Sequence, residues 1–556
     1  MPSGIEFKLF APRNEQATLM GSFSNWQEIP MNKDEMGYFR TQIKLEDGIY
    51  QYKFRVQSKS PSFEPNQWVD VTDPYATEVI DDQTQNGVVR ILGGKRTVES
   101  YLWQHDGQPL PDNQELIIYE MHVADFAEDQ QDAPKQPRFK QVAQKLDYLS
   151  ELGVNAIELM PINEYPGTYR WGYKVRHFFA VESSYGSPQD LKYLIDECHA
   201  RGIRVILDGI YNHTDEESPL LLIDRDYWYY HGAHYPDDPD NYWGPEFNYD
   251  HYDNQLDIRP AWKFIGDVVR FWIQEYHIDG IRYDAVRQLG NFDFFSWITQ
   301  EAKQAAGSKP FYNIAEHIPE NPEILVPKGP LEACWHESFR IFVLESICGQ
   351  DFDLEKLKEV LDPRRQGYTG TTSVVNYLGS HDREHFIVEL GDRGIFDQAA
   401  LQRIKLAVVL QMTAVGIPML WMGDEFGESK HKSASVSQPN KLQWSLLDNE
   451  LNRDLLEHYK RLIALRKTNP SLHTENIDFC HEDPEAKVLA YQRSHDSGSR
   501  LVVVANFSEQ SLTQYKIPKM SIAETWHEWL SQEIVHSQAD GLILDLPAYA
   551  AKVFVG

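Results

Sequence analysis

The stretch Gly280-Ile281-Arg282-Tyr283-Asp284-Ala285 contains a short apolar strand that ends on an aspartate. Apolar residues at helical spacing run from 262 to 277 just before it, and a further strand pattern follows at 312–316. The same alternation of short strand and helical stretch extends over residues 112–480. Recurring βα units of this kind predict a parallel sheet, either open or closed into a barrel.

Strand candidates occur often enough along this region to close a barrel. Seven of them lie at residues 116–119, 156–159, 205–208, 280–284, 312–316, 374–378 and 418–421. A further strand near residues 339–342 would make eight, the number in a TIM barrel. Helical patterns at residues 139–152, 188–201 and 262–277 lie between them.

The two ends of the chain alternate apolar and polar residues in the manner of β-strands. Residues 4–95 show this alternation between Gly, Asn and Asp turns, and it returns at residues 487–491, 501–505 and 551–555. We therefore expect an α/β chain: a (β/α)8 TIM barrel with an N-terminal β-sandwich and a C-terminal antiparallel β domain. The expected boundaries are 1–100, 101–483 and 484–556.

One connection in the barrel is unusually long. About 50 residues separate the strand at 205–208 from the helical pattern near 260, above the usual length of a βα loop. This insertion, at about 214–260, is dense in aromatic residues. It is either a structural subdomain or a wall that faces a ligand, and the two interpretations are compatible.

The charge of the chain restricts its partners. Lys and Arg number 53 against 84 Asp and Glu, a formal net charge of -31. A protein with this much negative charge repels phosphate backbones and anionic lipid. We therefore expect that it binds neither nucleic acid nor a membrane. The aromatic fraction, 12%, is compatible with a large core and also with sugar-binding surfaces.

The cysteines indicate a reducing compartment. Cys198, Cys334, Cys348 and Cys480 are scattered, with neither metal-ligand spacing nor a disulfide framework. No secretory signal and no apolar run long enough to span a bilayer is visible. We expect a cytoplasmic protein whose oligomeric state the sequence does not indicate.

Ionisable residues stand at the carboxyl ends of several predicted strands. They are Asp208, Asp284, Glu316 and the turn Ser380-His381-Asp382. One such aspartate usually caps the helix that follows, but four at corresponding places predict a shared site, because these strand ends meet on one face of a barrel.

The spacing of two carboxyl groups suggests a chemistry. Arg282 lies two residues before Asp284, on the same strand face, and would keep that carboxylate ionised. Apolar Ile314 and Ala315 precede Glu316 and would raise its pKa. A charged carboxylate beside a protonated one is the arrangement for glycoside cleavage with retention. Structural ion pairing remains the rival interpretation.

Four strings, in order, resemble the alpha-amylase superfamily, glycoside hydrolase family 13. They are Asp208-Gly209-Ile210-Tyr211-Asn212-His213, Gly280-Ile281-Arg282-Tyr283-Asp284-Ala285, Ala315-Glu316, and Gly379-Ser380-His381-Asp382. Trp171-Gly172-Tyr173 and the stretch at 184–191 match as well, so the resemblance covers nearly the whole chain. It implies an enzyme that acts on α-glucan oligo- or polysaccharides.

The resemblance also assigns roles. It makes Asp284 the nucleophile, Glu316 the general acid and base, and Asp382 the third carboxylate, which binds and distorts the sugar. The substrate-binding residues that it implies are Tyr173, Asp208, His213, Arg282 and His381. No cofactor is expected: a structural calcium ion near Asn212 occurs in some members, but a hydrogen-bonding role is favoured here.

The first 95 residues resemble a starch- or glycogen-binding-type β module. Phe10-Ala11-Pro12, Gly21-Ser22-Phe23-Ser24-Asn25-Trp26 and Asp73-Pro74-Tyr75-Ala76 carry this likeness. Trp26 is equally compatible with a glucan contact and with packing.

The member of the family is left open by its specificity positions. Val286-Arg287-Gln288 stands where endo-amylases usually have Lys-His, His317 follows Glu316, and Arg383 follows Asp382. We expect a retaining hydrolase of glycogen, starch or maltodextrin. A 1,4-α-glucan branching enzyme and a maltooligosyl-trehalose trehalohydrolase are the alternatives, and a non-catalytic glucan-binding protein is the alternative of another class.

Overall fold

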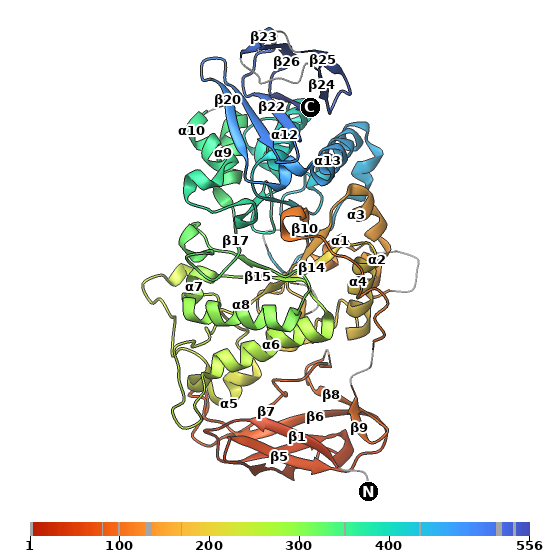
Figure 1. Ribbon diagram of the computed structural model, residues 1–556. Coiled ribbons are helices and arrows are strands. Elements are labelled where there is room, and N and C mark those ends of the chain that lie inside the picture. Colours follow the sequence, from red (N-terminus) through yellow and green to blue (C-terminus); the bar gives the residue numbers. More distant parts are fainter. Residues whose placement is uncertain are drawn as a thin grey trace.

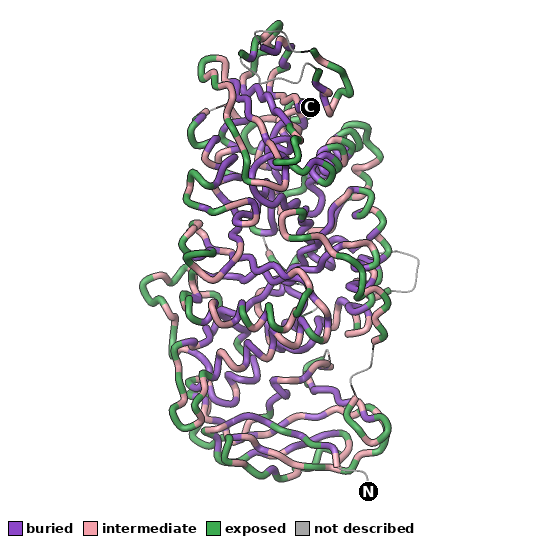
Figure 2. The backbone as a smooth tube through the Cα atoms, in the orientation of Figure 1, coloured by how far each residue is buried: buried purple, intermediate pink, exposed green. Residues whose placement is uncertain are grey.

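The protein is elongated, with three parts arranged along its length (Figure 1). The computed structural model describes residues 4–80, 82–97, 101–127, 136–167, 170–349, 352–432, 435–518, 525–536 and 541–556. An N-terminal β module lies at one end, a barrel occupies the middle, and a C-terminal β domain lies at the other end (Figure 1). Buried backbone runs through the interior of all three parts (Figure 2).

The middle part is a closed barrel of eight parallel strands, which confirms the predicted fold. In order around the barrel these are β10 (Ile118–Met121), β11 (Ala156–Leu159), β14 (Arg204–Gly209), β15 (Gly280–Tyr283), β16 (Tyr312–Ala315), β17 (Ala333–Trp335), β18 (Val374–Tyr377) and β19 (Ile417–Trp421). Strand β10 pairs with β19, so the sheet has no edge.

The prediction for the sixth strand was wrong. That strand is β17, and residues 339–342 lie inside helix α9 (Glu337–Cys348). Strand β17 has only three residues, which is too short an apolar run to identify a strand. Phe339 and Val343 are four residues apart and both buried, which is the spacing of a helix face.

Helices surround the barrel; all but the last lie in the connections between its strands, and the last follows β19. They are α1 (Val123–Phe126), α2 (Arg138–Gln144), α3 (Leu146–Leu152), α4 (Pro188–Ala200), α5 (Pro219–Trp228), α6 (Pro260–Tyr276), α7 (Val286–Leu289), α8 (Phe292–Ala306), α9, α10 (Leu354–Leu361), α11 (Phe386–Asp392), α12 (Asp397–Thr413) and α13 (Glu450–Thr468). The stretch predicted at 139–152 is two helices, because the backbone leaves helical geometry at Lys145.

The N-terminal module consists of two antiparallel sheets, as predicted. Its strands are β1 (Ile5–Phe10), β2 (Ala17–Gly21), β3 (Ile29–Pro30), β4 (Asn32–Lys33), β5 (Tyr38–Ile43), β6 (Gly48–Gln57), β7 (Trp68–Val71), β8 (Gly87–Leu92) and β9 (Lys95–Thr97). In β1 the buried Phe7 and Leu9 alternate with the exposed Glu6 and Lys8, so one face of the strand enters the core.

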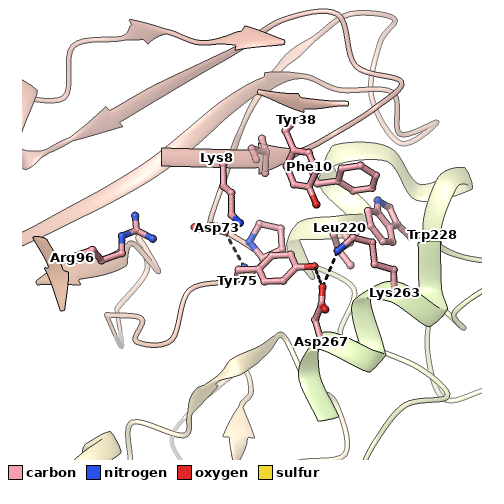
Figure 3. Close-up of a pocket in the computed structure, with 12 residues that line it drawn as sticks. Lys8, Phe10, Tyr38, Asp73, Tyr75, Arg96, Leu220, Trp228, Lys263 and Asp267 are labelled. Carbon is pink, nitrogen blue, oxygen red and sulfur yellow. Dashed lines mark hydrogen bonds and ion pairs between the residues drawn. The ribbon is translucent and has the colours of Figure 1, made fainter. Parts of the chain in front are cut away.

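This module packs on the aromatic-rich insertion and on helix α6. Figure 3 shows the junction, where Tyr75 points at Asp267 of α6 and Phe10 lies against Trp228 of the insertion. The Tyr75 hydroxyl donates to Asp267 over 2.8 Å, and Arg13 donates to the buried Asp224 over 2.6 Å. Part of the insertion therefore serves as a packing surface between two domains.

The C-terminal part is antiparallel, again as predicted. Its strands are β20 (Ile477–Asp483), β21 (Val488–Ser494), β22 (Arg500–Asn506), β23 (Leu512–Pro518), β24 (Thr525–Glu528), β25 (Ile534–His536), β26 (Gly541–Leu546) and β27 (Ala550–Val555). Six of them form one sheet, and β23 pairs with β26 in a second. In the described segments of the chain, no helix combines the length and apolar character required to cross a bilayer.

The interior of the barrel has an apolar layer. Twelve side chains, almost fully buried, form it: Leu116, Ile118, Ala156, Ile206, Tyr312, Ile314, Ala333, Trp335, Val375, Tyr377, Ile417 and Met419. Because strand side chains alternate, residues two positions further along share this inward face. Asp208 follows Ile206 in this way, and Glu316 follows Ile314. The strand period thus places acidic groups above an apolar floor.

Candidate functional site

A pocket of about 440 Å³ opens at the carboxyl ends of the barrel strands. Its lining residues are Tyr165, Arg170, Trp171, Gly172, Tyr173, Lys174, His213, Trp243, Asp284, Glu316, His381, Asp382 and Val436. Six of the eight site residues predicted from the sequence are in this lining. The other two, Asp208 and Arg282, are buried and hydrogen-bond to its members.

Arg282 links the third and fourth strands of the barrel. Its Nη1 donates to Asp208 Oδ1 over 2.6 Å and to Asp284 Oδ1 over 2.9 Å. The guanidinium carbon lies 4.4 Å from the centre of the Trp335 ring, and the side chain is fully buried. A cation confined in this way fixes the orientation of the Asp284 carboxylate.

The ionisation of Asp284 is less simple than the sequence suggested. Burial raises the pKa of its carboxyl well above the usual range, the Arg282 guanidinium lowers it, and Glu316 raises it again. Without substrate, burial and its acidic neighbours outweigh the one cation. Arg282 is therefore the neighbour that favours the ionised form of Asp284.

A strained backbone connects Asp284 to Glu316. Ala285 has φ 52° and ψ 41°, a left-handed conformation that costs an alanine roughly 1–2 kcal/mol. This conformation directs the Ala285 N–H at Glu316 Oε2, 2.7 Å away. The Glu316 backbone N–H in turn donates to the Tyr283 carbonyl over 2.9 Å. The turn after β15 thus holds the second carboxyl group beside the first.

The fourth motif brings His381 and Asp382 into the same pocket. The ring Nε2 of His381 lies 3.1 Å from Asp382 Oδ1, and its Nδ1 lies 2.6 Å from Glu120 Oε1. Burial lowers the pKa of the His381 ring, but the Asp382 and Glu120 carboxylates raise it to about 10. Burial alone would raise the pKa of Asp382; the His381 imidazolium holds it below its usual range.

Tyr173 and His213 complete the predicted set. The Tyr173 hydroxyl donates to Asp208 Oδ2 over 2.5 Å, and the ring stacks on His381 with centroids 5.0 Å apart. His213 Nε2 donates to the Tyr173 carbonyl over 2.8 Å, and burial lowers the pKa of its ring to about 4. His213 is therefore neutral, and this one ring N–H is already bonded to the backbone.

Three further groups at the site were missed in the sequence. Glu120 on β10 and Glu158 on β11 are each 1% exposed and lie opposite each other in the parallel register. Both are polar residues inside short apolar strands, two residues after Ile118 and Ala156, and that signal could have identified them. Lys432 also contacts the site, from the loop after β19, and donates to the Ser380 carbonyl over 2.8 Å.

The insertion contributes an aromatic side chain to the pocket. Trp243 is 39% exposed, and its ring centre lies 5.8 Å from that of His213. The next residue must be glycine, since a Cβ there would lie 2.5 Å from the Thr214 carbonyl oxygen. Both interpretations of the insertion therefore hold: much of it packs, and Trp243 faces the pocket.

The surroundings of Asn212 do not fit a calcium ion. Its amide donates to Glu246 Oε1 over 3.4 Å, and Glu246 Oε2 also accepts the His234 N–H over 2.6 Å. Calcium takes six to eight oxygen ligands, whereas this carboxylate is occupied by N–H donors. Across the residues that the structure describes, no group of three or more His, Cys, Asp or Glu could hold a metal ion.

The arginine side chains at two of the unusual specificity positions form ion pairs. Arg383 lies 2.7 Å from Glu337 of α9, and Arg287 lies 3.7 Å from Asp238 of the insertion. Arg383 and Arg287, at positions where the family usually has other residues, thus form ion pairs with neighbouring segments of the chain.

The geometry as a whole can support displacement at a sugar carbon. A buried carboxylate oriented by a guanidinium can act as a nucleophile, and an adjacent carboxyl group can transfer a proton. The pocket combines these two groups with a third carboxylate and with the aromatic rings of Trp171, Tyr173 and Trp243.

Comparison with known families matches all three parts of the chain. Residues 130–325 match the alpha amylase catalytic domain, and residues 1–76 match carbohydrate-binding module 48, the isoamylase N-terminal domain. Residues 480–555 match the alpha amylase C-terminal all-beta domain.

Individual relatives are similar over most of the chain. A malto-oligosyltrehalose trehalohydrolase from Saccharolobus solfataricus is 26% identical, over 86% of this chain and 88% of that protein. A 1,4-alpha-glucan branching enzyme GlgB from Aquifex aeolicus is also 26% identical, over 92% of this chain and 84% of its own length. The structure of a type I pullulanase from Bacillus subtilis, complexed with maltose, has the same fold: its TM-score is 0.83 at 22% identity, over 99% of this chain and 83% of that one.

Proposed function

This chain belongs to the alpha-amylase family, and we propose that it cleaves α-glucosidic bonds of glycogen, starch or maltodextrin with retention of configuration. The observation that carries the proposal is the pair of carboxyl groups, Asp284 and Glu316, held together by Arg282 and by the Ala285 N–H. Retention requires a nucleophile and a proton donor on either side of one glycosidic bond.

In the first step, an Asp284 oxygen attacks the anomeric carbon of the sugar bound in the pocket. The bond from that carbon to the glycosidic oxygen breaks, and its electron pair stays on the oxygen. Glu316 gives its proton to this oxygen, so the leaving sugar departs as a neutral alcohol. A glycosyl ester of Asp284 remains.

In the second step, the Glu316 carboxylate takes a proton from a water molecule as its oxygen attacks the same carbon. The ester bond breaks, and its electron pair returns to Asp284. Two displacements restore the α configuration. Asp382, held by His381, would bind hydroxyl groups of the sugar and stabilise the positive charge that develops on the ring. The reaction is carboxyl chemistry and requires no cofactor.

The remaining predicted residues would shape the sugar site. Tyr173 and His381 would line one side of the sugar ring. Asp208 would hold Tyr173 and Arg282 in place. We also propose a cytoplasmic location, which the four unpaired cysteines of the described chain support.

A sugar hydroxyl could replace water in the second step. The similarity to branching enzymes supports this transglycosylase alternative, and the similarity to a trehalohydrolase over 88% of its length supports hydrolysis next to a trehalose end. The chemistry as far as the glycosyl ester is common to all three.

The deciding experiment compares the parent with Asp284→Asn on glycogen, linear maltodextrin and maltooligosyl-trehalose. A hydrolase releases reducing sugar, which the variant fails to do. New α-1,6 branch points with little reducing sugar would identify a branching enzyme instead of a hydrolase, and free trehalose would identify a trehalohydrolase. Equal signals from parent and variant would leave only glucan binding.

A further inference from the structure

Three adjacent barrel strands each bury a carboxyl group beneath the pocket. Glu120, Glu158 and Asp208 come from β10, β11 and β14, and none is more than 3% exposed. Asp208 has partners in Arg282 and Tyr173. The other two have no part in the proposed reaction, and burying them costs free energy unless they are neutral or paired.

Glu120 and Glu158 differ sharply in their contacts. Glu120 Oε2 accepts the backbone N–H of His381 over 3.2 Å, and its Oε1 faces the ring Nδ1 at 2.6 Å. Both oxygens of Glu158 lack a hydrogen-bond partner among the described residues, and burial together with the Glu120 charge raises its pKa well above the usual range. Of these two neighbours, Glu120 is the one whose surroundings favour a negative charge.

The His381 ring therefore lies between two carboxylates. Its Nδ1 faces Glu120 and its Nε2 faces Asp382, so both ring nitrogens must carry protons to donate. The ring also stacks on Tyr173, and Trp171 and Trp335 make T-shaped contacts with it, with centroids 5.6 and 5.8 Å away. It has little freedom to turn.

Asp382, by contrast, is half open to solvent. Its side chain is 42% exposed, and the ion pair with His381 anchors it. Lys432 strengthens the same turn, because it donates to the carbonyls of Ser380 and His381. The position of the third carboxylate thus depends on a ring, and the charge of that ring depends on Glu120.

We propose that Glu120 is a positioning residue, which keeps His381 protonated and thereby fixes Asp382 and its negative charge beside the sugar. The proposal deepens the proposed function and rests on it. Three charged side chains thus form a series: the buried Glu120 carboxylate on the first strand, the His381 imidazolium, and the Asp382 carboxylate at the wall of the pocket.

Several other charges face this series. Glu158 and the Tyr173 hydroxyl lie next to the ring, and Arg282 and Lys432 act on Asp382. The two cations favour the ionised form of Asp382 but oppose the cationic form of the ring. Glu120 and Asp382 are the two carboxylates that contact the His381 ring nitrogens and stabilise the imidazolium.

The test is Glu120→Gln, which keeps the shape of the side chain and removes its charge. His381 then loses a proton within the working pH range, so the alkaline limb of kcat/KM moves down by a pH unit or more. Activity at pH 8 falls at least tenfold relative to activity at pH 6, chiefly in kcat. Glu425→Gln is the matched control, because Glu425, in the short 3-10 turn Asp424–Phe426 after β19, is equally buried but accepts from Tyr119 and Tyr148, away from the pocket.

A double-mutant cycle separates positioning from a general loss of stability. If Glu120 acts through Asp382, Glu120→Gln has little further effect in an Asp382→Asn background, whereas independent roles multiply their losses. An unmoved alkaline limb, or multiplied losses, overturns the proposal. If the variant does not fold, the ¹⁵N titration of the His381 ring in the parent decides, and a neutral ring at pH 7 refutes it. Asp284→Asn run alongside tests the proposed function separately.

Discussion

Replacing Arg282 by methionine removes the one cation that contacts the proposed nucleophile. The guanidinium donates to Asp284 over 2.9 Å in a fully buried position. At an effective dielectric constant near 20, two unit charges about 4 Å apart attract by roughly 4 kcal/mol. Losing this attraction disfavours the ionised form of Asp284 by the same free energy and raises its pKa further, at about 1.4 kcal/mol per factor of ten in the ionised population. Ionised nucleophile then becomes scarcer by a factor on the order of 10³.

The assay is the initial rate of glycosidic cleavage in maltodextrin between pH 5 and pH 9. We expect kcat/KM of Arg282→Met to be lower than that of the parent by on the order of 10³ at pH 6 and to rise about tenfold per pH unit, as Asp284 ionises. Arg204→Met is the control: this arginine is also fully buried, but it donates to Asn113 and to the Asp279 carbonyl, outside the pocket. A loss below tenfold, or a loss with an unchanged pH profile, refutes the reasoning.

Further predictions concern the other parts of the molecule. Glu316→Gln should lower kcat on maltodextrin by about 10²–10⁴ with little change in KM; an unchanged kcat contradicts its role. Burial raises the pKa of Glu158 in the folded protein above its value in the unfolded chain, so the folded protein becomes less stable as the pH rises above the unfolded value. Glu158→Gln should therefore raise Tm at pH 8 but not at pH 4, and equal Tm shifts at both pH values would contradict this. Trp243→Ala should raise KM for maltodextrin about tenfold, the equivalent of 1.4 kcal/mol, at similar kcat; a change confined to kcat would argue against an aromatic sugar platform. Arg13→Ala, which leaves Asp224 buried without its partner, should cost about 1–3 kcal/mol in urea unfolding, and Asp224→Asn in the same chain should recover part of the loss.

The sequence predicted the barrel because its strands are apolar runs separated by helical spacing. It failed at β17, where three residues, Ala333–Trp335, make a strand too short to have a pattern. The helix pattern at 139–152 hid a break at Lys145, because the buried face continues across it. Short strands and local breaks in a helix depend on tertiary packing, and the hydrophobic periodicity of the sequence does not reveal them.

The motifs located the residues that line the pocket but not the two carboxyl groups buried beneath it. Asp208, Asp284 and Glu316 end their strands, where polar residues stand out. Glu120 and Glu158 lie inside apolar strands, and only the closed barrel shows that β10 lies next to β19 and just below the fourth motif. The charge of Asp284 also depends on several carboxyl groups that meet only in the folded chain.

The central claim is that Asp284 forms a covalent bond to the sugar. A fluorinated, activated maltosyl substrate slows release of such an intermediate, and peptide mass spectrometry then locates it. We predict one added fluorinated maltosyl group on the peptide that contains Asp284, and none in Asp284→Asn. Label on a different carboxyl group, or turnover of the substrate to the inverted anomer with no label, would contradict the account.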